Sequence, residues 1–377
     1  MNILQPQIIR IDKRRYRKNP CTLNFQITEQ IEPYEEETDD MYIERKTKQY
    51  DDEYTEETCC IDMKSHHIPA EDFKDIAFIN GYYKYEMRVA DAFYGFIIGR
   101  NGEKKSNLER ETQTTIRIPR KNQSDYITIE GNDRKSVASC RNRLELLIQT
   151  ARNQKQFTHL ITFPLKFESL KHKFKEFIDL VLKDCSQDRG VHESLFQLPN
   201  KLHLTVNTVT LLSEFEVDQA VNILEHCRKT FIKELLDGKK LQVRIKGLEY
   251  MNDDPSQVDV LYAKIKEENG NGSVIQGISD GIMKKFVDSG LGKKQFDKVK
   301  LHATVMNSLR RQDQSIENEF DEKKEHKGQR ESFDCRNILK LYGDFDFGVY
   351  NLEEIHLSLR YSSAADGYYE CISKINI

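Results

Sequence analysis

The 377-residue sequence contains no run of apolar residues long enough to cross a membrane. A transmembrane helix needs about 20 consecutive, mostly apolar residues. The first residues, MNILQPQIIRIDKRR, also lack the apolar block of a secretory signal. These two absences predict a soluble, intracellular protein that has no membrane partner.

Cysteine pairs of the kind that bind zinc or build a disulfide framework are absent as well. The eight cysteines are scattered, no C-x-x-C spacing occurs, and only Cys59 and Cys60 are adjacent. Small secreted scaffolds and zinc ribbons both need regular cysteine spacing. The sequence therefore predicts a reducing compartment and no structural metal site.

Charge is unevenly distributed, although the formal net charge is only −4. Residues 1–80 hold 11 Lys and Arg against 18 Asp and Glu, residues 81–150 hold 13 against 9, and residues 151–377 hold 34 against 35. The basic surplus lies in one short segment, as expected of a module that binds a polyanion. Taken alone, a surplus of this size is more often an ordinary solvated surface, so its meaning depends on the motifs within it.

The first 75 residues combine blocks of charge with low hydrophobicity. A basic cluster at residues 13–18 precedes an acidic stretch at residues 29–57 that shows no sustained apolar period. Such a composition predicts a disordered tail over residues 1–75. The basic cluster is either a nuclear-import signal or a solvated arm. The acidic stretch is either a docking segment for a partner or a solubilising tail.

Residues 82–152 follow a regular succession of strand and helix patterns. An alternating run at 82–89 precedes a glycine-punctuated helical segment, strand-like runs follow at 115–119 and 125–130, and an amphipathic helix spans about 134–152. The predicted order is β-α-α-β-β-α. Gly99 and Gly102 lie between the first two helices, where they permit a tight turn that can approach a phosphate chain closely.

The segment YGFIIGRNGEKKSNLERETQTTIRIP resembles the signature of a type I KH domain, here expected over residues 76–152. The resemblance implies that the loop between the helices clamps the backbone of single-stranded RNA, while an apolar groove and the loop at 120–124 hold the bases. Ile98 is either a platform for a base or part of the core. The residues that the resemblance assigns to RNA binding are Ile98, Gly99, Arg100, Asn101, Gly102, Lys104 and Lys105.

A second domain is predicted over residues 153–377. Strands are expected at 157–165, 202–212, 241–250, 258–265, 299–306, 345–350, 354–361 and 369–375, and helices at 168–183, 217–236 and 274–287. The polar residues 312–329 form a predicted mobile loop. This pattern predicts an α+β fold.

Two nearly identical peptides occur in predicted strands of this domain, KLHLTV at 201–206 and KLHATV at 300–305. Because side chains alternate along a strand, His203 and Thr205 point to one face, and so do His302 and Thr304. A single such histidine is more often a structural residue. Two copies of an imidazole beside a hydroxyl are hard to attribute to packing, since packing needs neither group.

Two such strands facing each other would place two imidazoles and two hydroxyls around one small volume. An imidazole titrates near neutral pH, so one histidine can take a proton from water or a ribose hydroxyl while the other protonates the departing oxygen. The threonines can donate hydrogen bonds to the non-bridging oxygens. This chemistry suits a phosphodiester and requires neither a metal nor a cofactor.

The two H-x-T motifs resemble those of the two-histidine phosphoesterase superfamily, which includes RNA ligase-like, cyclic-nucleotide phosphodiesterase and oligoadenylate phosphodiesterase proteins. The resemblance implies two pseudo-symmetric lobes around a cleft, a metal-independent phosphodiesterase, and substrates such as 2′,3′-cyclic phosphates, 2′-5′ linkages or RNA 3′ ends. His356 and Ser358 form a third, weaker match, which we interpret as structural. The residues that the resemblance assigns to catalysis are His203, Thr205, His302 and Thr304.

A type I KH domain followed by a two-histidine phosphoesterase domain is similar to one family of nuclear complex subunits. That resemblance implies partner subunits of a helicase-containing cointegrator complex, a role in transcription coactivation and in the response to alkylated nucleic acid, and a nuclear location with a cytoplasmic pool. The leading interpretation is an RNA-binding phosphodiesterase that takes a nucleotide or cyclic phosphate ligand. The alternatives are a non-catalytic RNA-binding adaptor, whose second domain only binds nucleotides, and a surface for docking partners.

Overall fold

The computed structural model describes residues 8–11, 14–17, 75–120, 126–268, 273–293, 296–311 and 330–377. Most of the predicted tail, the loop at 120–124 apart from Arg120, and the loop at 312–329 therefore lie outside the described residues. The chain divides into two units, Met1–Glu35 and Glu36–Ile377. In the first unit, β1 (Ile8–Ile11) and β2 (Arg14–Arg17) form an antiparallel hairpin inside the segment for which the sequence indicates disorder.

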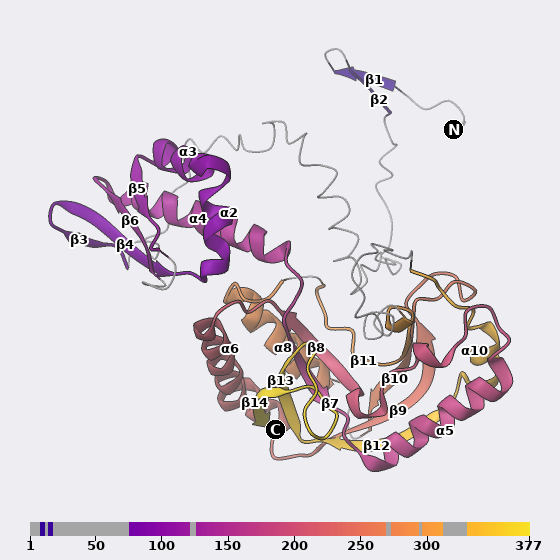
Figure 1. Cartoon of the computed structure of the whole chain (residues 1–377). Coiled ribbons are helices and arrows are strands. Elements are labelled where there is room, and N and C mark those ends of the chain that lie inside the picture. Colours follow the sequence, from indigo (N-terminus) through magenta and orange to yellow (C-terminus); the bar gives the residue numbers. More distant parts are fainter. Residues whose placement is uncertain are drawn as a thin grey trace. The chain divides into compact units, whose positions relative to one another are not determined.

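The second unit begins with a four-stranded antiparallel sheet and three α-helices (Figure 1). They follow the predicted order β-α-α-β-β-α, with one additional strand in front. The strand order is β3-β4-β6-β5, so β3 extends the sheet at the outer edge of β4. The elements are β3 (Ala77–Ile79), β4 (Tyr82–Arg88), α2 (Tyr94–Ile98), α3 (Glu103–Thr112), β5 (Thr114–Arg117), β6 (Tyr126–Gly131) and α4 (Arg134–Asn153).

The core of this sheet follows from the periods of its elements. Ile127 and Ile129 alternate along β6, and Val137 and Leu144 recur on one face of α4; all four are fully buried. The helix begins after Asp133, whose carboxylate accepts a hydrogen bond from the backbone N–H of Ser136 at 3.0 Å. Local patterns thus define this small fold well.

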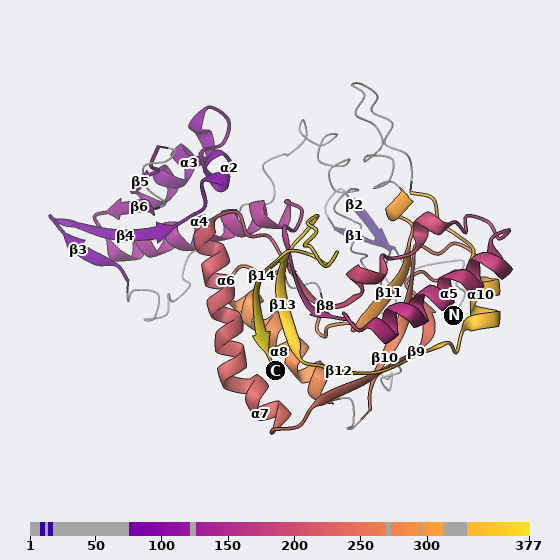
Figure 2. The ribbon, with the colours of Figure 1, turned by 60° about the horizontal axis from the view of Figure 1, so that its bottom comes forward.

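The remainder of the unit is built on an eight-stranded antiparallel sheet that curls strongly (Figures 1 and 2). The order across the sheet is β12-β9-β10-β11-β8-β7-β13-β14, so β8 and β11 lie at its centre with three strands on either side. The strands are β7 (His159–Pro164), β8 (His203–Val209), β9 (Leu241–Tyr250), β10 (Val260–Glu267), β11 (His302–Asn307), β12 (Asp346–Leu352), β13 (Glu354–Leu359) and β14 (Cys371–Asn376).

Helices pack against this sheet in two pairs (Figure 1). One pair, α5 and α10, lies beside β12 and β9, whereas α6 and α8 lie beside β14, β8 and β10. Fully buried side chains such as Phe163, Phe174, Leu204 and Ile278 join helices and strands in one core. The opposite face of the central strands is therefore left for polar groups. The helices are α5 (Glu168–Cys185), α6 (Glu214–Cys227), α7 (Lys233–Leu236), α8 (Ser273–Asp288) and α10 (Arg336–Tyr342).

A buried ion pair anchors the end of α4 to the start of α6. Arg152 donates to the two carboxylate oxygens of Glu216 at 2.6 and 3.3 Å and to the carbonyl oxygen of Thr210. The two charged side chains are only 8% and 3% exposed. The guanidinium also lies 4.9 Å from the centroid of the Phe93 ring. Among all these described elements, no helix is long and apolar enough to cross a membrane.

Candidate functional site

The two central strands of the large sheet carry the repeated peptide. β8 and β11 run antiparallel, and Ala303 is paired with Leu204. These two side chains are buried in the core, at 3% and 0% exposed. Because side chains alternate along a strand, the residues flanking each of them point to the opposite face. That face carries His203, Thr205, His302 and Thr304.

The antiparallel register brings these four side chains together. Counting outward from the pair of Ala303 and Leu204 sets His203 opposite Thr304 and sets Thr205 opposite His302. Directly opposed Cβ atoms lie about 5 Å apart and diagonal neighbours about 7–8 Å apart. The two histidines are diagonal neighbours, a separation that one phosphate group can bridge. His203 is partly exposed, whereas His302 lies deeper and keeps 7% of its surface exposed.

Both imidazoles are fixed by the same contact. Nδ1 of His203 lies 2.7 Å from the carbonyl oxygen of Lys201, and Nδ1 of His302 lies 2.8 Å from that of Lys300. A carbonyl oxygen can only accept a hydrogen bond, so Nδ1 carries a proton in both rings. Nε2 is then an acceptor in the neutral ring and a donor in the protonated ring. Either histidine can thus take up or deliver a proton at Nε2.

A tyrosine ring stands edge-on to each histidine. The Tyr369 and His203 ring centroids are 5.5 Å apart. The Tyr262 and His302 ring centroids are 5.1 Å apart. Tyr262 belongs to β10, where it is paired with Thr304, and Tyr369 precedes β14. Sequence reasoning missed both tyrosines, because neither lies near an H-x-T motif and only strand pairing brings them to the site.

A lysine accompanies each of these tyrosines. Lys201 Nζ lies 4.9 Å from the centroid of the Tyr369 ring. Lys300 Nζ lies at the same distance, 4.9 Å, from the centroid of the Tyr262 ring. The lysine of each K-L-H peptide therefore places a positive charge near the face that carries the histidines, which favours an anionic ligand.

The third histidine motif lies on the same face but is closed off from solvent. His356 is paired with Thr162 of β7, and Thr162 is paired with Thr205. His356 and Ser358 are 2% and 0% exposed. Nε2 of His356 lies 2.8 Å from a carboxylate oxygen of Glu354. Burial lowers the pKa of His356, and the contact with Glu354 opposes this effect. A shielded imidazole of this kind fits the structural interpretation.

The two glycines between α2 and α3 adopt backbone conformations that favour glycine. Gly99 has φ 72° and ψ −179°, and Gly102 has φ 80°. A Cβ atom on Gly99 would lie 2.7 Å from Cγ of Lys104. The tight turn η3 (Arg100–Gly102) joins the two helices. Apart from its chain neighbours, no atom of the described residues lies within 4 Å of the position of a Cβ on Gly102, so the backbone of this loop is open to close approach there.

Three polar side chains of this loop project into solvent. Arg100, Asn101 and Lys104 are exposed. The ammonium group of Lys104 lies 4.1 Å from the centroid of the Phe96 ring. The loop therefore presents two cations and an amide beside its exposed backbone.

Two of the residues assigned to RNA binding have other neighbours. Lys105 forms an ion pair with Glu109 at 2.8 Å, and Glu109 also accepts the backbone N–H of Ile116 at 2.7 Å. Ile98 is partly buried and packs against the edge of the core. Part of the Ile98 side chain thus remains accessible beside the loop.

Comparison with known proteins gives matches to both parts and to the whole chain. A KH domain model matches residues 84–146, and the model described as AKAP7 2′5′ RNA ligase-like domain matches residues 157–377. "Activating signal cointegrator 1 complex subunit 1" of Mus musculus is 37% identical over 374 residues, covering 98% of each chain. The chain belongs to this family.

These matches confirm the predicted combination of a KH domain and a two-histidine phosphoesterase-like domain in an α+β protein. The boundaries at residues 75/76 and 152/153 stay predictions. Among solved structures, the first type I KH domain of human Vigilin is 26% identical and covers 24% of this chain and 89% of its own, with a TM-score of 0.19. E. coli LigT complexed with NADP+ is 13% identical and covers 59% of this chain and 98% of its own, with a TM-score of 0.32.

Proposed function

We propose that this chain binds single-stranded RNA through its KH domain and hydrolyses nucleotide phosphodiesters or 2′,3′-cyclic phosphate ends through its second domain, without a metal. One observation carries the proposal. Two histidines on neighbouring strands each hold a proton at Nδ1 and present Nε2 to the same face of the sheet. Each histidine has a threonine beside it, so the arrangement has two acid-base groups and two hydroxyl donors.

For a 2′,3′-cyclic phosphate, the neutral histidine removes a proton from water through Nε2 as the water oxygen bonds to phosphorus. The bond from phosphorus to one ribose oxygen breaks on the opposite side. The protonated histidine delivers its Nε2 proton to that oxygen, which leaves a phosphomonoester and a free hydroxyl. Thr205 and Thr304 donate hydrogen bonds to the non-bridging oxygens as charge builds on them.

The KH domain supplies the RNA. Its loop carries Arg100, Asn101 and Lys104 on the surface, and its backbone is uncovered at Gly102. Such a loop holds the sugar-phosphate chain of single-stranded RNA while a neighbouring groove takes the bases. Ile98, at the edge of that groove, contributes apolar contact to a base.

The chain also acts, in this proposal, as a nuclear subunit of a helicase-containing cointegrator complex that serves transcription coactivation and the response to alkylated nucleic acid. Support comes from the 37% identity, along almost the whole chain, to the mouse protein named "Activating signal cointegrator 1 complex subunit 1". Co-purification of complex subunits with the tagged chain, together with microscopy of its location, tests this part. Recovery of the chain without any such subunit contradicts it.

Turnover by the purified full-length chain tests the enzymatic proposal. The substrates are 2′,3′-cyclic AMP and a 2′-5′-linked diadenylate, incubated with EDTA and analysed by chromatography. His203→Ala and His302→Ala should each lower kcat/KM at least about 100-fold, because a positioned acid or base contributes at least that much. The exposed His172 on α5 provides the control His172→Ala, which should retain full activity.

Turnover that persists in both histidine variants contradicts the proposal. Binding of the substrates by the unaltered chain, without any product after long incubation, would instead identify a non-catalytic adaptor. Circular dichroism of each variant shows whether a loss of activity reflects loss of the fold.

A further inference from the structure

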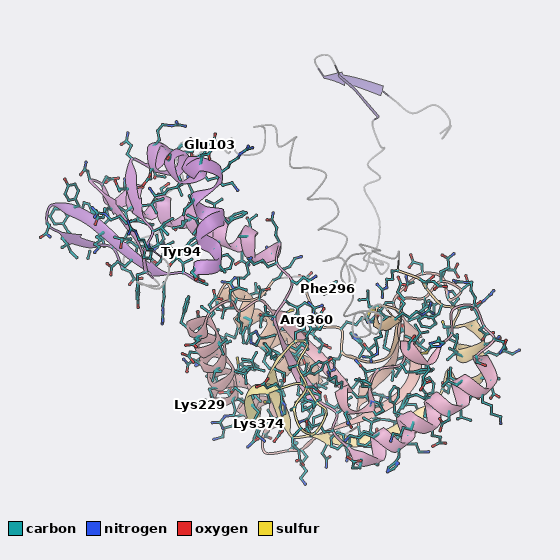
Figure 3. The ribbon with its side chains drawn as sticks, in the orientation of Figure 1. Tyr94, Glu103, Lys229, Phe296, Arg360 and Lys374 are labelled. Carbon is teal, nitrogen blue, oxygen red and sulfur yellow. The ribbon has the colours of Figure 1, made fainter. Side chains whose placement is uncertain are left out.

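We propose that Arg360 and Tyr361, where β13 ends, form a stacking subsite for one unpaired base of the nucleic acid whose phosphate enters the site. Arg360 is labelled in Figure 3. The inference rests on the proposed function and narrows it: the substrate is an oligonucleotide, and the stacked base belongs to the nucleotide before the one that carries the reacting phosphate. A mononucleotide would leave this subsite empty.

The backbone and the exposure of Tyr361 are both unusual. Its side chain is 72% exposed, more than any other large hydrophobic side chain in the described ranges. Its φ of 57° lies in the left-handed region, which bulky residues rarely adopt. Glycine or asparagine would adopt this conformation at lower cost. Because the ring is mostly exposed and its backbone is strained, the conformation indicates a functional demand on the ring.

Arg360 forms a stack with two aromatic rings. Its guanidinium carbon lies 3.7 Å from the centroid of the Phe157 ring and 4.3 Å from that of the Tyr361 ring. A further hydrogen bond, at 3.2 Å, joins the guanidinium to the carbonyl oxygen of Phe157 and fixes its plane. The cation covers one face of the Tyr361 ring, and the exposure of Tyr361 leaves the other face open. A flat open ring beside a cation is a surface on which nucleobases stack.

A short series of contacts connects this stack to His203. The carbonyl oxygen of Ser362, the residue after Tyr361, accepts a hydrogen bond from Lys201 Nζ at 3.0 Å. The same Nζ lies 4.9 Å from the Tyr369 ring centroid, and that ring contacts His203. The positive charge of Lys201 therefore lies between the stack and the histidine. The groups therefore follow one another as the parts of a nucleic acid strand do. The stack would hold a base, Lys201 the linking phosphate, and the histidines the reacting phosphate.

An unpaired base fits these groups better than a peptide does. Bases of every type have a flat π face, so one exposed ring accepts any of them, and the neighbouring cations attract the phosphate chain. A peptide would supply no negative charge at each step of its backbone. The subsite is therefore expected to be tolerant of base identity and sensitive to salt.

Binding is tested with the full-length chain carrying Arg100→Asp and Asn101→Asp, which place negative charge on the exposed KH loop and remove its hold on RNA. The probe is a labelled RNA tetranucleotide with a 3′-phosphate, followed by fluorescence anisotropy. Tyr361→Ala in this background should weaken binding about 5- to 150-fold, the range expected for the loss of one stacked base. Tyr361→Phe keeps the ring and should bind as the parent does. Leu341→Ala, at a site that is 53% exposed on α10, should also leave binding unchanged.

An abasic tetranucleotide shows whether the ring contacts a base. It should bind the parent more weakly than the normal tetranucleotide and should bind Tyr361→Ala with the same affinity as the parent. Equal affinity of the parent and Tyr361→Ala for the normal tetranucleotide overturns the subsite. The subsite is also overturned if Tyr361→Ala loses as much affinity for the abasic tetranucleotide as for the normal one.

Hydrolysis is measured separately on 2′,3′-cyclic AMP, which does not extend to the stack. Tyr361→Ala should leave kcat/KM for this substrate unchanged while lowering it for a tetranucleotide that ends in a 2′,3′-cyclic phosphate. Should neither substrate be turned over by the unaltered chain, the enzymatic proposal fails. A loss of tetranucleotide binding in Tyr361→Ala would still support the subsite in that case.

Discussion

At the scale of single residues, Thr205 and Thr304 each differ from a valine only by a hydroxyl group in place of a methyl group. Thr205→Val and Thr304→Val keep the shape of the side chain but remove the hydroxyl that would bind a non-bridging oxygen. We expect each to lower kcat for 2′,3′-cyclic AMP roughly 100-fold with little change in KM, because the lost contact strengthens in the transition state. Thr115→Val, at an exposed position of β5 in the KH sheet, is the control. Unchanged kcat in both site variants would show that the hydroxyls play no such part.

The buried His356 makes the stability of the fold depend on pH. Burial lowers its pKa, and burial lowers the pKa of His159 in the same way, so the folded chain binds these protons more weakly than the unfolded chain does. Stability is therefore present above the ordinary imidazole pKa of about 6.5 and is lost as pH falls below it. One such group changes the free energy of unfolding by at most about 1.4 kcal/mol per pH unit.

A comparison of His356→Gln with the unaltered chain measures this contribution. Urea denaturation at pH 7.5, 6.5 and 5.5 should show a smaller loss of stability on acidification for the variant, although the variant is less stable at pH 7.5. Glu354, whose pKa is lowered by its hydrogen bonds to Lys374 and His356, contributes a separate loss at still lower pH. Identical pH dependence of the two proteins would mean that His356 is not the responsible group.

Some residues of the site could be predicted from the sequence and others could not. The alternation of side chains along a strand is local, so the sequence sufficed to predict that His203 and Thr205 share a face. The neighbouring Tyr262 and Tyr369 could not be predicted, because their positions depend on the order and register of strands far apart in the chain. Arg360 and Tyr361 carry no motif at all, and only their stacking and backbone conformation distinguish them.

At the scale of elements, the buried pair of Arg152 and Glu216 joins α4 to α6. Arg152→Met leaves the Glu216 carboxylate buried beside an apolar chain, so we expect a loss of about 3–5 kcal/mol of stability. The double variant with Glu216→Leu should recover most of that loss, since no uncompensated charge remains. Thermal and urea unfolding of both variants provide the measurement. Removing the exposed pair of Lys173 and Glu176 on α5 should change little.

If the single and double variants are equally stable, the buried charge of Glu216 is not the cause of the loss. The lost stability then comes from side-chain packing. The guanidinium also contacts the Phe93 ring, so packing contributes in any case. A Met side chain retains much of that contact, which is why Met is preferred to Ala in this test.

The boundaries of several elements differ from those that the sequence pattern predicts. The sequence predicted one helix over 217–236, but the helix begins at Glu214 and a π-helical turn, η6 (Arg228–Ile232), separates α6 from α7. Within this turn Thr230 has φ −98° and ψ −106°, and the ring of Phe231 closely approaches Gly281 of α8. The interruption of the helix thus coincides with packing against α8. The periodicity of the sequence contains no information about that packing. The short β3 and α10 were missed because three and seven residues give too little periodicity to detect.

At the scale of the whole molecule, the chain joins a KH module to a module that carries two histidines on one face of its sheet. The pairing of modules was predictable because each has its own signature, the glycine loop in one and the repeated K-L-H-x-T-V peptide in the other. A surplus of basic residues occurs only in the segment of the KH domain, so electrostatic attraction of RNA belongs mainly to that domain. Binding of long RNA and turnover of small substrates should therefore respond to different substitutions.

The double variant Arg100→Asp and Asn101→Asp tests this separation. We expect it to weaken binding of a 20-nucleotide single-stranded RNA at least about 10-fold and to reduce the slope of log K against log salt by about 1, as loss of one or two phosphate contacts would. Its kcat/KM for 2′,3′-cyclic AMP should equal that of the unaltered chain, since a mononucleotide does not reach the loop. Lys239→Asp with Lys240→Asn changes the net charge by the same amount at an exposed turn far along the chain and should affect neither quantity. A fall in mononucleotide turnover specific to the loop variant would mean that the KH loop contributes to the catalytic site itself, and that the two modules do not act separately.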